Sequence, residues 1–199
     1  DLNQDELRLG GLRINPTTNI SSTVTYVNNL KLRKIKDLNE VQVTGLPTNP
    51  RISTIAWSPN DKKISFSHTT ATGVELWVID VALAKATRLT EATVNANIGS
   101  PFSWMNDNET ILVKMLPKNR AALLDAKKDL PTGPIISNAD GAKSQNRTYP
   151  DMLKNKNDEI NFENIMTSEL YKVNLNGTAT LFKKADMYAG ESFSPDGNY

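Results

Sequence analysis

The chain has 199 residues, a net charge of +1 at pH 7, 38% hydrophobic residues and 23% charged residues. This length is enough for one large domain or two small ones, and the composition is typical of a folded chain rather than a disordered one. The balanced charge excludes the basic surplus that nucleic-acid binding needs, and no apolar run approaches the roughly 20 residues of a membrane-spanning helix.

Cysteine is absent, and His68 is the single histidine. The chain therefore offers no disulfide and no thiolate metal site, and we expect no cofactor and no metal. A cysteine-free chain suits the cytosol, and it also suits a periplasmic or secreted bacterial protein that avoids mispaired disulfides. One histidine argues against a His-based catalytic site complete within this chain, so we expect His68 to be a hydrogen-bonded or surface residue.

Residues 24–45 hold the first predicted pair of strands. The stretch LKLRKIKDLNEVQVTGLP at residues 30–47 indicates a strand, a turn and a second strand. It is a weaker copy of a pattern that returns twice farther along the chain, and Leu30 lies 46 residues before the equivalent Leu76. We therefore expect half of a repeated unit here.

Residues 52–90 predict one complete unit of four strands. The stretch IAWSPNDKKISF at residues 55–66 combines an aromatic residue, a polar turn and alternating apolar residues. ELWVIDVALAKATRLT at residues 75–90 adds a strand, a short turn and a strand. The run from Leu76 to Ile79 is apolar on both faces, whereas a hairpin with one face in water would alternate more cleanly. Both faces of this unit should therefore be covered.

A second unit is predicted over residues 98–184. FSWMNDNETILV at residues 102–113 repeats the aromatic residue, the Asn/Asp turn and the apolar strand, with its tryptophan 47 residues after Trp57. ELYKVNLNGTATLFKK at residues 169–184 repeats the second half, with an Asn-Gly turn that tolerates the positive φ angles of a tight hairpin.

An insertion at residues 117–166 interrupts this second unit. Its first part is rich in Lys, Asn, Pro and Gly and has little periodicity, which predicts a long loop. Its second part carries spaced apolar residues among acidic ones, which indicates one or two short helices packed on the fold. Loops of this length inside a compact domain are usually functional or mobile, so we expect a cover over the face where the repeated units are linked. The alternative is a family-specific decoration with no ligand role.

The unit of four strands thus recurs about every 45 residues, the period and strand count of a β-propeller blade. A further copy begins in SFSPDGNY, so another blade starts over residues 191–199. We predict an all-β fold, a partial β-propeller of about three to four blades with a long loop and short-helix insertion in one blade. Trp57 and Trp104 should pack between blades. The alternative is a β-sandwich or meander with chance similarity.

Two complete blades and two fragments cannot close a ring of four to eight blades. Open sheet edges favour pairing, so self-association through them is expected if the piece stands alone. We therefore expect residues 1–199 to be a fragment of one propeller domain, whose partner is the remainder of the same polypeptide, or half of an assembly. A complete small all-β domain is a weaker alternative, because the last hairpin is cut off.

Several stretches resemble the N-terminal propeller region of serine peptidases of the prolyl oligopeptidase family. They include AWSPNDKKISF, GSPFSWM and RTYPDMLKNKNDEINFENIMTSEL. The resemblance is to the glutamyl endopeptidase-like branch found in bacteria and plant chloroplasts, and it covers nearly the whole chain. The Trp-Ser-Pro pattern is shared by many propellers, whereas the insertion and GSPFSWM are more specific.

This resemblance implies a propeller that lies over an α/β-hydrolase domain, restricts access and helps to hold peptide substrates. The hydrolase domain would carry a Ser-Asp-His triad on a Gly-x-Ser-x-Gly elbow. The present sequence contains no such elbow, so we expect the catalytic domain to be absent from it and assign no catalytic residue. The rival hypothesis is a non-enzymatic propeller, a scaffold or binding module similar to TolB-type periplasmic propellers.

Three cations of the insertion are candidate substrate-binding residues: Arg120, Arg147 and, as a lesser candidate, Lys118. A peptidase that cuts after glutamate must pair a desolvated carboxylate with a cation, and arginine does so with two parallel hydrogen bonds. The alternative for both arginines is a solvated or structural salt bridge. Asp61, Asp107 and Asp196 lie at equivalent turns, where we expect them to stabilise the backbone rather than bind metal.

Overall fold

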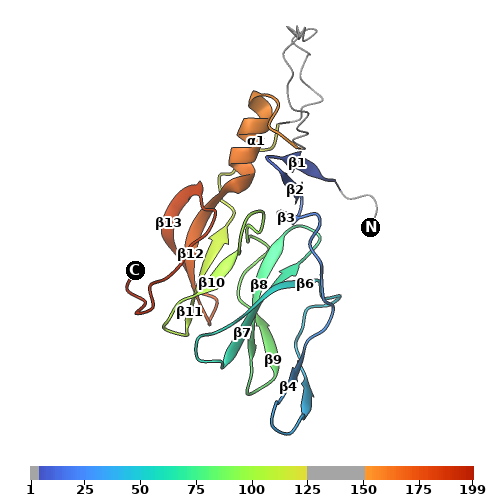
Figure 1. Cartoon of the computed structure of the whole chain (residues 1–199), viewed down its shortest axis with the longest axis vertical. Helices are drawn as coiled ribbons and strands as arrows, with labels where there is room; N and C mark the ends of the chain where they lie inside the picture. The colour runs from blue at the N-terminus through green and yellow to red at the C-terminus, as the bar shows by residue number, and fades with distance from the viewer. Residues whose placement is uncertain (1–4, 125–150) are drawn as a thin grey trace, which may run out of the picture.

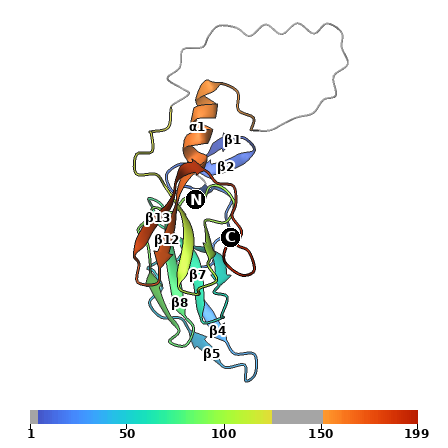
Figure 2. The same ribbon diagram turned by 90° about the vertical axis from the view of Figure 1, so that its left-hand side faces the viewer.

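The computed structural model describes residues 5–124 and 151–199 of the chain. Within them the fold is all-β apart from one helix, α1 (Lys156–Met166). Figures 1 and 2 show an elongated molecule with α1 and a small sheet at one end and a two-stranded hairpin at the other. The predicted all-β partial propeller is confirmed, and α1 is a short helix in the predicted insertion, whose predicted loop lies largely outside the described residues. No helix among the described residues is long and apolar enough to span a membrane.

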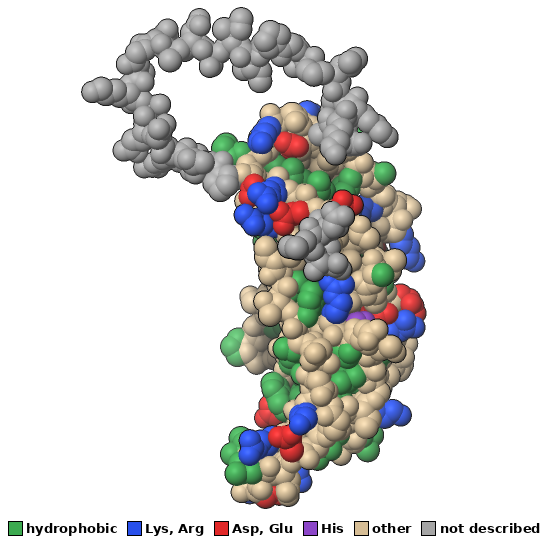
Figure 3. Space-filling view, turned by 90° about the vertical axis from the view of Figure 1, so that its right-hand side faces the viewer, with side chains coloured by type: hydrophobic (Ala, Val, Ile, Leu, Met, Phe, Trp, Pro, Cys, Tyr) green, Lys and Arg blue, Asp and Glu red, His purple; other side chains and the backbone are tan. Residues whose placement is uncertain are grey.

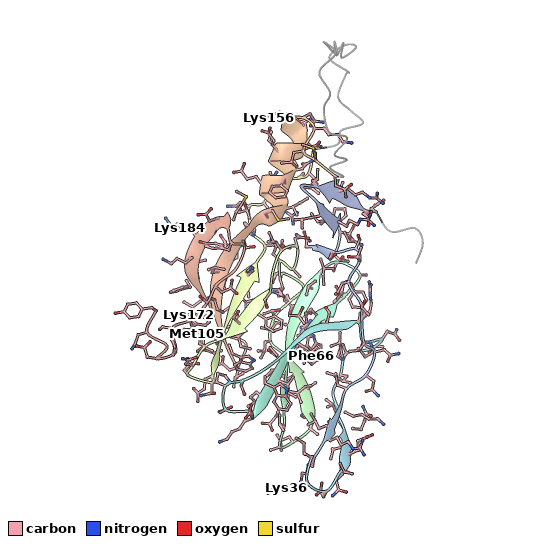
Figure 4. The ribbon with its side chains drawn as sticks, viewed as in Figure 1. Lys36, Phe66, Met105, Lys156, Lys172 and Lys184 are labelled. Carbon is pink, nitrogen blue, oxygen red and sulfur yellow. The ribbon has the colours of Figure 1, made fainter. Side chains whose placement is uncertain are left out.

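The first blade is an antiparallel sheet whose strands follow sequence order: β6 (Ile52–Trp57), β7 (Lys63–Thr69), β8 (Val74–Asp80) and β9 (Lys85–Arg88). Its two faces are both buried. Phe66, at the middle of this sheet in Figure 4, packs in one hydrophobic cluster with Ile79, and Leu76 packs in another on the opposite face. Side chains alternate between faces along a strand, so apolar residues in succession require a neighbour on each side.

The second blade repeats this order with four further antiparallel strands: β10 (Phe102–Trp104), β11 (Thr110–Met115), β12 (Thr167–Asn174) and β13 (Ala179–Met187). The insertion, with α1 at its end, separates β11 from β12. Every residue of β13 is exposed, so this strand is a free edge of the sheet within the part of the chain that the structure describes.

The hairpin of β4 (Lys31–Arg33) and β5 (Glu40–Gln42) corresponds to the outer half of a blade. Its register pairs Lys31 with Gln42, which is the Trp77–Arg88 pair of the first blade moved by 46 positions. Just after β5, the N–H of Thr44 donates to the carbonyl of Ala84 at 2.8 Å and links the hairpin to β9. We call β4 and β5 the outer hairpin.

The turn that joins the first two strands of a blade recurs three times with the same backbone hydrogen bond. The bond joins the N–H of one residue to the carbonyl five residues later, at 2.7–2.9 Å. A residue with positive φ closes each turn. The bonded pairs are Ser58 with Lys63, Met105 with Thr110, and Ser194 with Tyr199, and the positive-φ residues are Asp61, Asn108 and Gly197.

The structure corrects one detail of the predicted equivalence between the aspartates of the three turns. Asp107 and Asp196 accept backbone N–H bonds within their turns, as expected for residues that stabilise a turn. The residue that does so in the first turn is Asn60, which accepts from the N–H of Lys62 at 3.1 Å. Asp61 instead occupies the positive-φ position, so it is one residue out of register with the other two aspartates.

Trp104 packs between the two blades, as predicted. Its side chain is 8% exposed, and its indole N–H donates to the hydroxyl of Ser65 on β7 at 2.8 Å. The same expectation is wrong for Trp57, which is 52% exposed. Trp57 lies on the side of the first blade that faces the outer hairpin, and no inner pair of strands from residues 5–124 and 151–199 packs against it there.

The end of the molecule opposite the outer hairpin holds a small sheet and α1: β1 (Leu7–Leu9), β2 (Leu12–Asn15) and β3 (Ile20–Ser21). The side chain of Asn155 caps α1 by accepting from the N–H of Asp158 at 2.9 Å. Ile165 of α1 is fully buried in a cluster with Leu9 and Ile14 of the small sheet. Apolar packing therefore fixes the helix on this sheet.

Two buried amides tie the end of α1 to the link between the blades. Asn95 donates to the carbonyls of Ile165 and Thr167 at 3.0 and 3.1 Å, and Asn97 donates to Ile165 at 3.2 Å. These bonds satisfy carbonyl groups at the C-terminal end of the helix, which have no partner within the helix itself. The insertion is therefore anchored to the link between the blades at the point where it rejoins β12.

Replacing Trp104 by alanine should lower the free energy of unfolding by about 3–5 kcal/mol, because it removes a buried indole and its hydrogen bond. Trp57→Ala is the matched control, since it removes the equivalent but half-exposed indole of β6, and its effect should be clearly smaller. Urea unfolding followed by circular dichroism measures both. Equal losses at the two positions would contradict the packing of Trp104 between blades.

Candidate functional site

A polar pocket lies where the insertion leaves and rejoins the second blade. It has a volume of about 540 Å³ and is bordered by the segment after β11, the C-terminal half of α1 and strand β12. Two cations, Lys118 and Arg120, line it together with Glu163, Glu169 and Tyr171. The pocket therefore combines both signs of charge with a hydroxyl group.

Arg120 is held in this pocket by the polypeptide around it. Its N–H donates to the carbonyl of Pro117 at 3.1 Å in a turn, and its guanidinium donates to the side-chain oxygen of Asn19. Asn19 is itself fixed, because its carbonyl accepts from Ala96 at 2.9 Å in the link between the blades. Three segments that are distant in sequence therefore meet at this arginine.

The charge of Arg120 is not neutralised by a carboxylate within residues 5–124 and 151–199, where no ion pair of Arg120 occurs. Burial lowers the pKa of its guanidinium, but an arginine remains protonated in proteins. A half-buried cation with one amide partner keeps donors available for an anionic group. The salt-bridge alternative for Arg120 therefore finds no partner among these residues.

The other two predicted cations have different positions. Lys118 is exposed at the rim of the same pocket, so the structure brings Lys118 and Arg120 together. Arg147 lies outside the described residues. The roles of all three in substrate binding stay predictions.

Carboxylates and a phenol form the opposite side of the pocket. The hydroxyl of Tyr171 donates to Glu169 at 3.1 Å. Burial, reinforced by this hydrogen bond and by the charge of Glu169, raises the pKa of Tyr171. The tyrosine therefore stays protonated and the pocket can offer donors and acceptors to a peptide-like ligand at neutral pH.

His68 is buried inside the first blade, where its side chain has a structural role. Its Nδ1 accepts the N–H of Arg51 at 3.2 Å, and its ring packs edge-on against Trp77 with centroids 6.3 Å apart. Burial lowers the pKa of the imidazole, and the charge of Glu75 opposes this shift in part. The side chain thus serves as a neutral hydrogen-bond acceptor inside the first blade.

One buried cation was missed in the sequence. Lys114 of β11 is 1% exposed, and its ammonium donates to the carbonyls of Ile98 and Ala189 and lies 3.7 Å from Glu191. Burial lowers its pKa, while Glu191 opposes the shift. The signal was present in the apolar run ILVKML, where a lysine interrupts a strand. Lys114 holds the segment that follows β13 against the second blade.

No group of three or more His, Cys, Asp or Glu side chains that could hold a metal ion occurs in the described ranges 5–124 and 151–199. Asp107 and Asp196 use their carboxylates within their own turns. The repeated aspartates therefore stabilise backbone turns.

Comparison with known proteins agrees with the predicted resemblance. The chain is 32% identical over its whole length to a probable chloroplastic glutamyl endopeptidase of Oryza sativa subsp. japonica, and 30% identical to the one of Arabidopsis thaliana. The chain is similar throughout to part of a glutamyl endopeptidase. It spans about a fifth of the length of these curated relatives, 22% in each case.

No protein-family model matches the chain. Among solved structures, Pyrococcus horikoshii acylaminoacyl peptidase superposes with a TM-score of 0.42 and 14% identity over 77% of this chain and 20% of its own. A second acylaminoacyl peptidase, in complex with Z-Gly-Gly-Phe-chloromethyl ketone, gives 0.40 and 16% over the same shares.

The lowered pKa of His68 predicts how stability depends on pH. The unfolded chain binds the imidazole proton more readily than the folded chain, so stability is highest above the ordinary pKa of 6.5 and falls as pH drops through the lowered folded value. His68→Gln keeps a side-chain acceptor for Arg51 but does not titrate. Between pH 7.5 and pH 5, the variant should lose less stability than the parent chain in urea titrations. Parallel pH profiles would show that the buried imidazole does not control this range.

Proposed function

We propose that the chain is the non-catalytic, N-terminal propeller portion of a serine peptidase of the prolyl oligopeptidase family. The observation that carries this proposal is the similarity over the whole chain to glutamyl endopeptidases of which it spans only 22%. The Gly-x-Ser-x-Gly elbow of an α/β-hydrolase does not occur in these 199 residues. Catalysis would therefore belong to another part of the parent polypeptide.

In this proposal residues 24–45, 52–90, 98–184 and 191–199 are successive parts of one propeller domain. The catalytic α/β-hydrolase domain is outside the chain, and the propeller restricts access to it and positions peptide substrates. The further blades and the hydrolase domain are then partners of this chain within the same polypeptide. The insertion at 117–166 covers the face on which the blades are linked.

The polar pocket supplies the substrate contact. Arg120 is anchored by Asn19 from one side and has no carboxylate partner among the described residues, so its fork can receive the carboxylate of a glutamate side chain. Lys118 at the rim adds a second positive charge. Glu163 and Glu169 on the other side suit the backbone N–H groups of a bound peptide.

The test uses the longer parent peptidase and two peptides that differ only in Glu or Gln before the cleaved bond. Arg120→Gln should lower kcat/KM for the Glu peptide roughly 10- to 100-fold, because a hydrogen bond to a charged group contributes about 1.5–3 kcal/mol. The Gln peptide should be affected much less. Arg120→Lys should restore part of the difference, since it keeps the charge but loses the fork.

Arg13→Gln, at an exposed position of β2 outside both the polar pocket and the outer hairpin, is the matched control and should leave both rates unchanged. An unchanged ratio of Glu to Gln cleavage in Arg120→Gln would remove this residue from substrate recognition. Absence of any peptidase activity in the longer protein would overturn the proposed function itself.

A further inference from the structure

A second hollow, far from the polar pocket, lies between the outer hairpin and the first blade. It is a groove of about 580 Å³ with mainly apolar walls. Leu32 and Val41 line it from the hairpin, and Ile55, Trp57 and Ile64 line it from the blade. In Figure 3, hydrophobic side chains are exposed over the lower half of the molecule, toward the end that β4 and β5 form.

The second blade contains the same surface in a covered form, because β10 is the repeat of β6. Ile55 and Trp57 of β6 are 47% and 52% exposed, whereas their counterparts Phe102 and Trp104 of β10 are 2% and 8% exposed. The strand registers are the same, since Trp57 pairs with Ile64 as Trp104 pairs with Ile111. The difference between the two blades therefore lies in the neighbour and not in the strands themselves.

The neighbour of Trp104 is the inner half of the first blade. Its indole N–H donates to Ser65 of β7 and, at 3.4 Å, to the carbonyl of Ala56 of β6. The outer hairpin has no such inner half among the described residues, where β4 and β5 form a sheet of two strands. Only residues 22–30 separate β3 from β4, which is too short for two strands and their turn. The indole of Trp57 correspondingly has no protein acceptor in the described part of the chain.

The outer hairpin also offers a free strand edge on the same side. The carbonyl of Leu30 accepts from the N–H of Val43, and the N–H of Lys34 donates to the carbonyl of Asn39, so both groups face β5. Backbone groups alternate in direction along a strand, so those of Lys31 and Arg33 point away from β5. In the first blade, the corresponding edge of β8 is paired with β7. An apolar groove and an unpaired edge therefore coincide where the inner half of a blade belongs.

We propose that this groove is the docking site of a β-hairpin from a distant segment of the same polypeptide, beyond Tyr199, which completes the outer hairpin as a four-stranded blade. One strand of that hairpin pairs with Lys31 and Arg33 of β4. Its apolar side covers Ile55 and Trp57, and a hydroxyl or carbonyl oxygen in the place of Ser65 accepts the indole N–H of Trp57. This inference rests on the proposed function, since it needs the longer polypeptide.

A second copy of this chain is a poorer occupant. In its complete blades the strands that occupy the corresponding place, β7 and β11, are already paired on both sides. The curated relatives, in contrast, are long enough to supply further strands, because the chain spans only 22% of them. Sharing one blade between two distant segments also removes the exposed edge of the outer hairpin.

Photo-crosslinking in the longer protein tests the docking site. With p-benzoylphenylalanine in place of Trp57, irradiation should give a cross-link within one polypeptide to a segment beyond residue 199, identified by peptide mass spectrometry. The matched control carries the same group in place of Leu83, which is exposed in the β8–β9 turn and should give none. Ile55 is the second position if replacement of Trp57 prevents folding. A cross-link between two copies, or none from either groove position, would overturn the proposal.

Hydrogen exchange gives an independent measurement on the unmodified longer protein. The amides of Lys31 and Arg33 should exchange at least ~100-fold more slowly than the amide of Ile35 in the exposed hairpin turn, because they are paired with the docked strand. Exchange as fast as that of Ile35 would mean that the edge is free and would overturn the proposal.

Neither readout depends on peptidase activity, so the two proposals can fail separately. An inactive longer protein that shows the cross-link beyond residue 199 would retract the proposed function and keep the shared blade. An active peptidase without the cross-link would keep the proposed function and retract the shared blade.

Discussion

The structure depends on one constraint: each four-stranded sheet is apolar on both faces and must be covered on both sides. In the first blade, Leu76 packs toward the second blade, while Phe66 packs toward the outer hairpin. Dispersion and the removal of apolar area from water stabilise such a stack only when the sheets are in contact. Trp104 fills the interface between the two complete blades and hydrogen-bonds across it, so the blades cannot move independently without exposing it.

The same constraint explains how much variation the repeat tolerates. The position that closes each inner turn needs positive φ, and the chain satisfies it with Asp61, Asn108 and Gly197 in turn. These are the residue types for which the left-handed region is least unfavourable. The position before each turn is likewise aromatic in all three repeats, tryptophan twice and phenylalanine once. Backbone geometry and burial therefore define the blade, and individual side chains can change within those limits.

Much of the fold could be predicted because it follows from local sequence patterns that recur along the chain. The alternation of apolar residues, the Asn/Asp turns and the period near 46 residues indicated the blades and the place of the insertion. The exposure of Trp57 could not be predicted, because it depends on which strands lie against β6. The contact between Arg120 and Asn19 joins residues 101 positions apart, and no local pattern indicates it. The sequence could nominate Arg120 as a cation of the insertion but could not place it in a pocket with Lys118.

The polar pocket and the groove are connected through a short stretch of chain. Asn19, which holds Arg120, is followed by β3 and residues 22–30, and these lead directly into the outer hairpin. This stretch is fixed to the first blade by a reciprocal pair of 2.9 Å bonds between Val27 and Ile52. The hairpin itself is held by Thr44, whose N–H donates to the carbonyl of Ala84 and whose carbonyl accepts from the N–H of Ala86 on β9. The chain that joins the two sites is therefore fixed at both ends, at Asn19 by Ala96 and near the hairpin by Ile52 and Ala84.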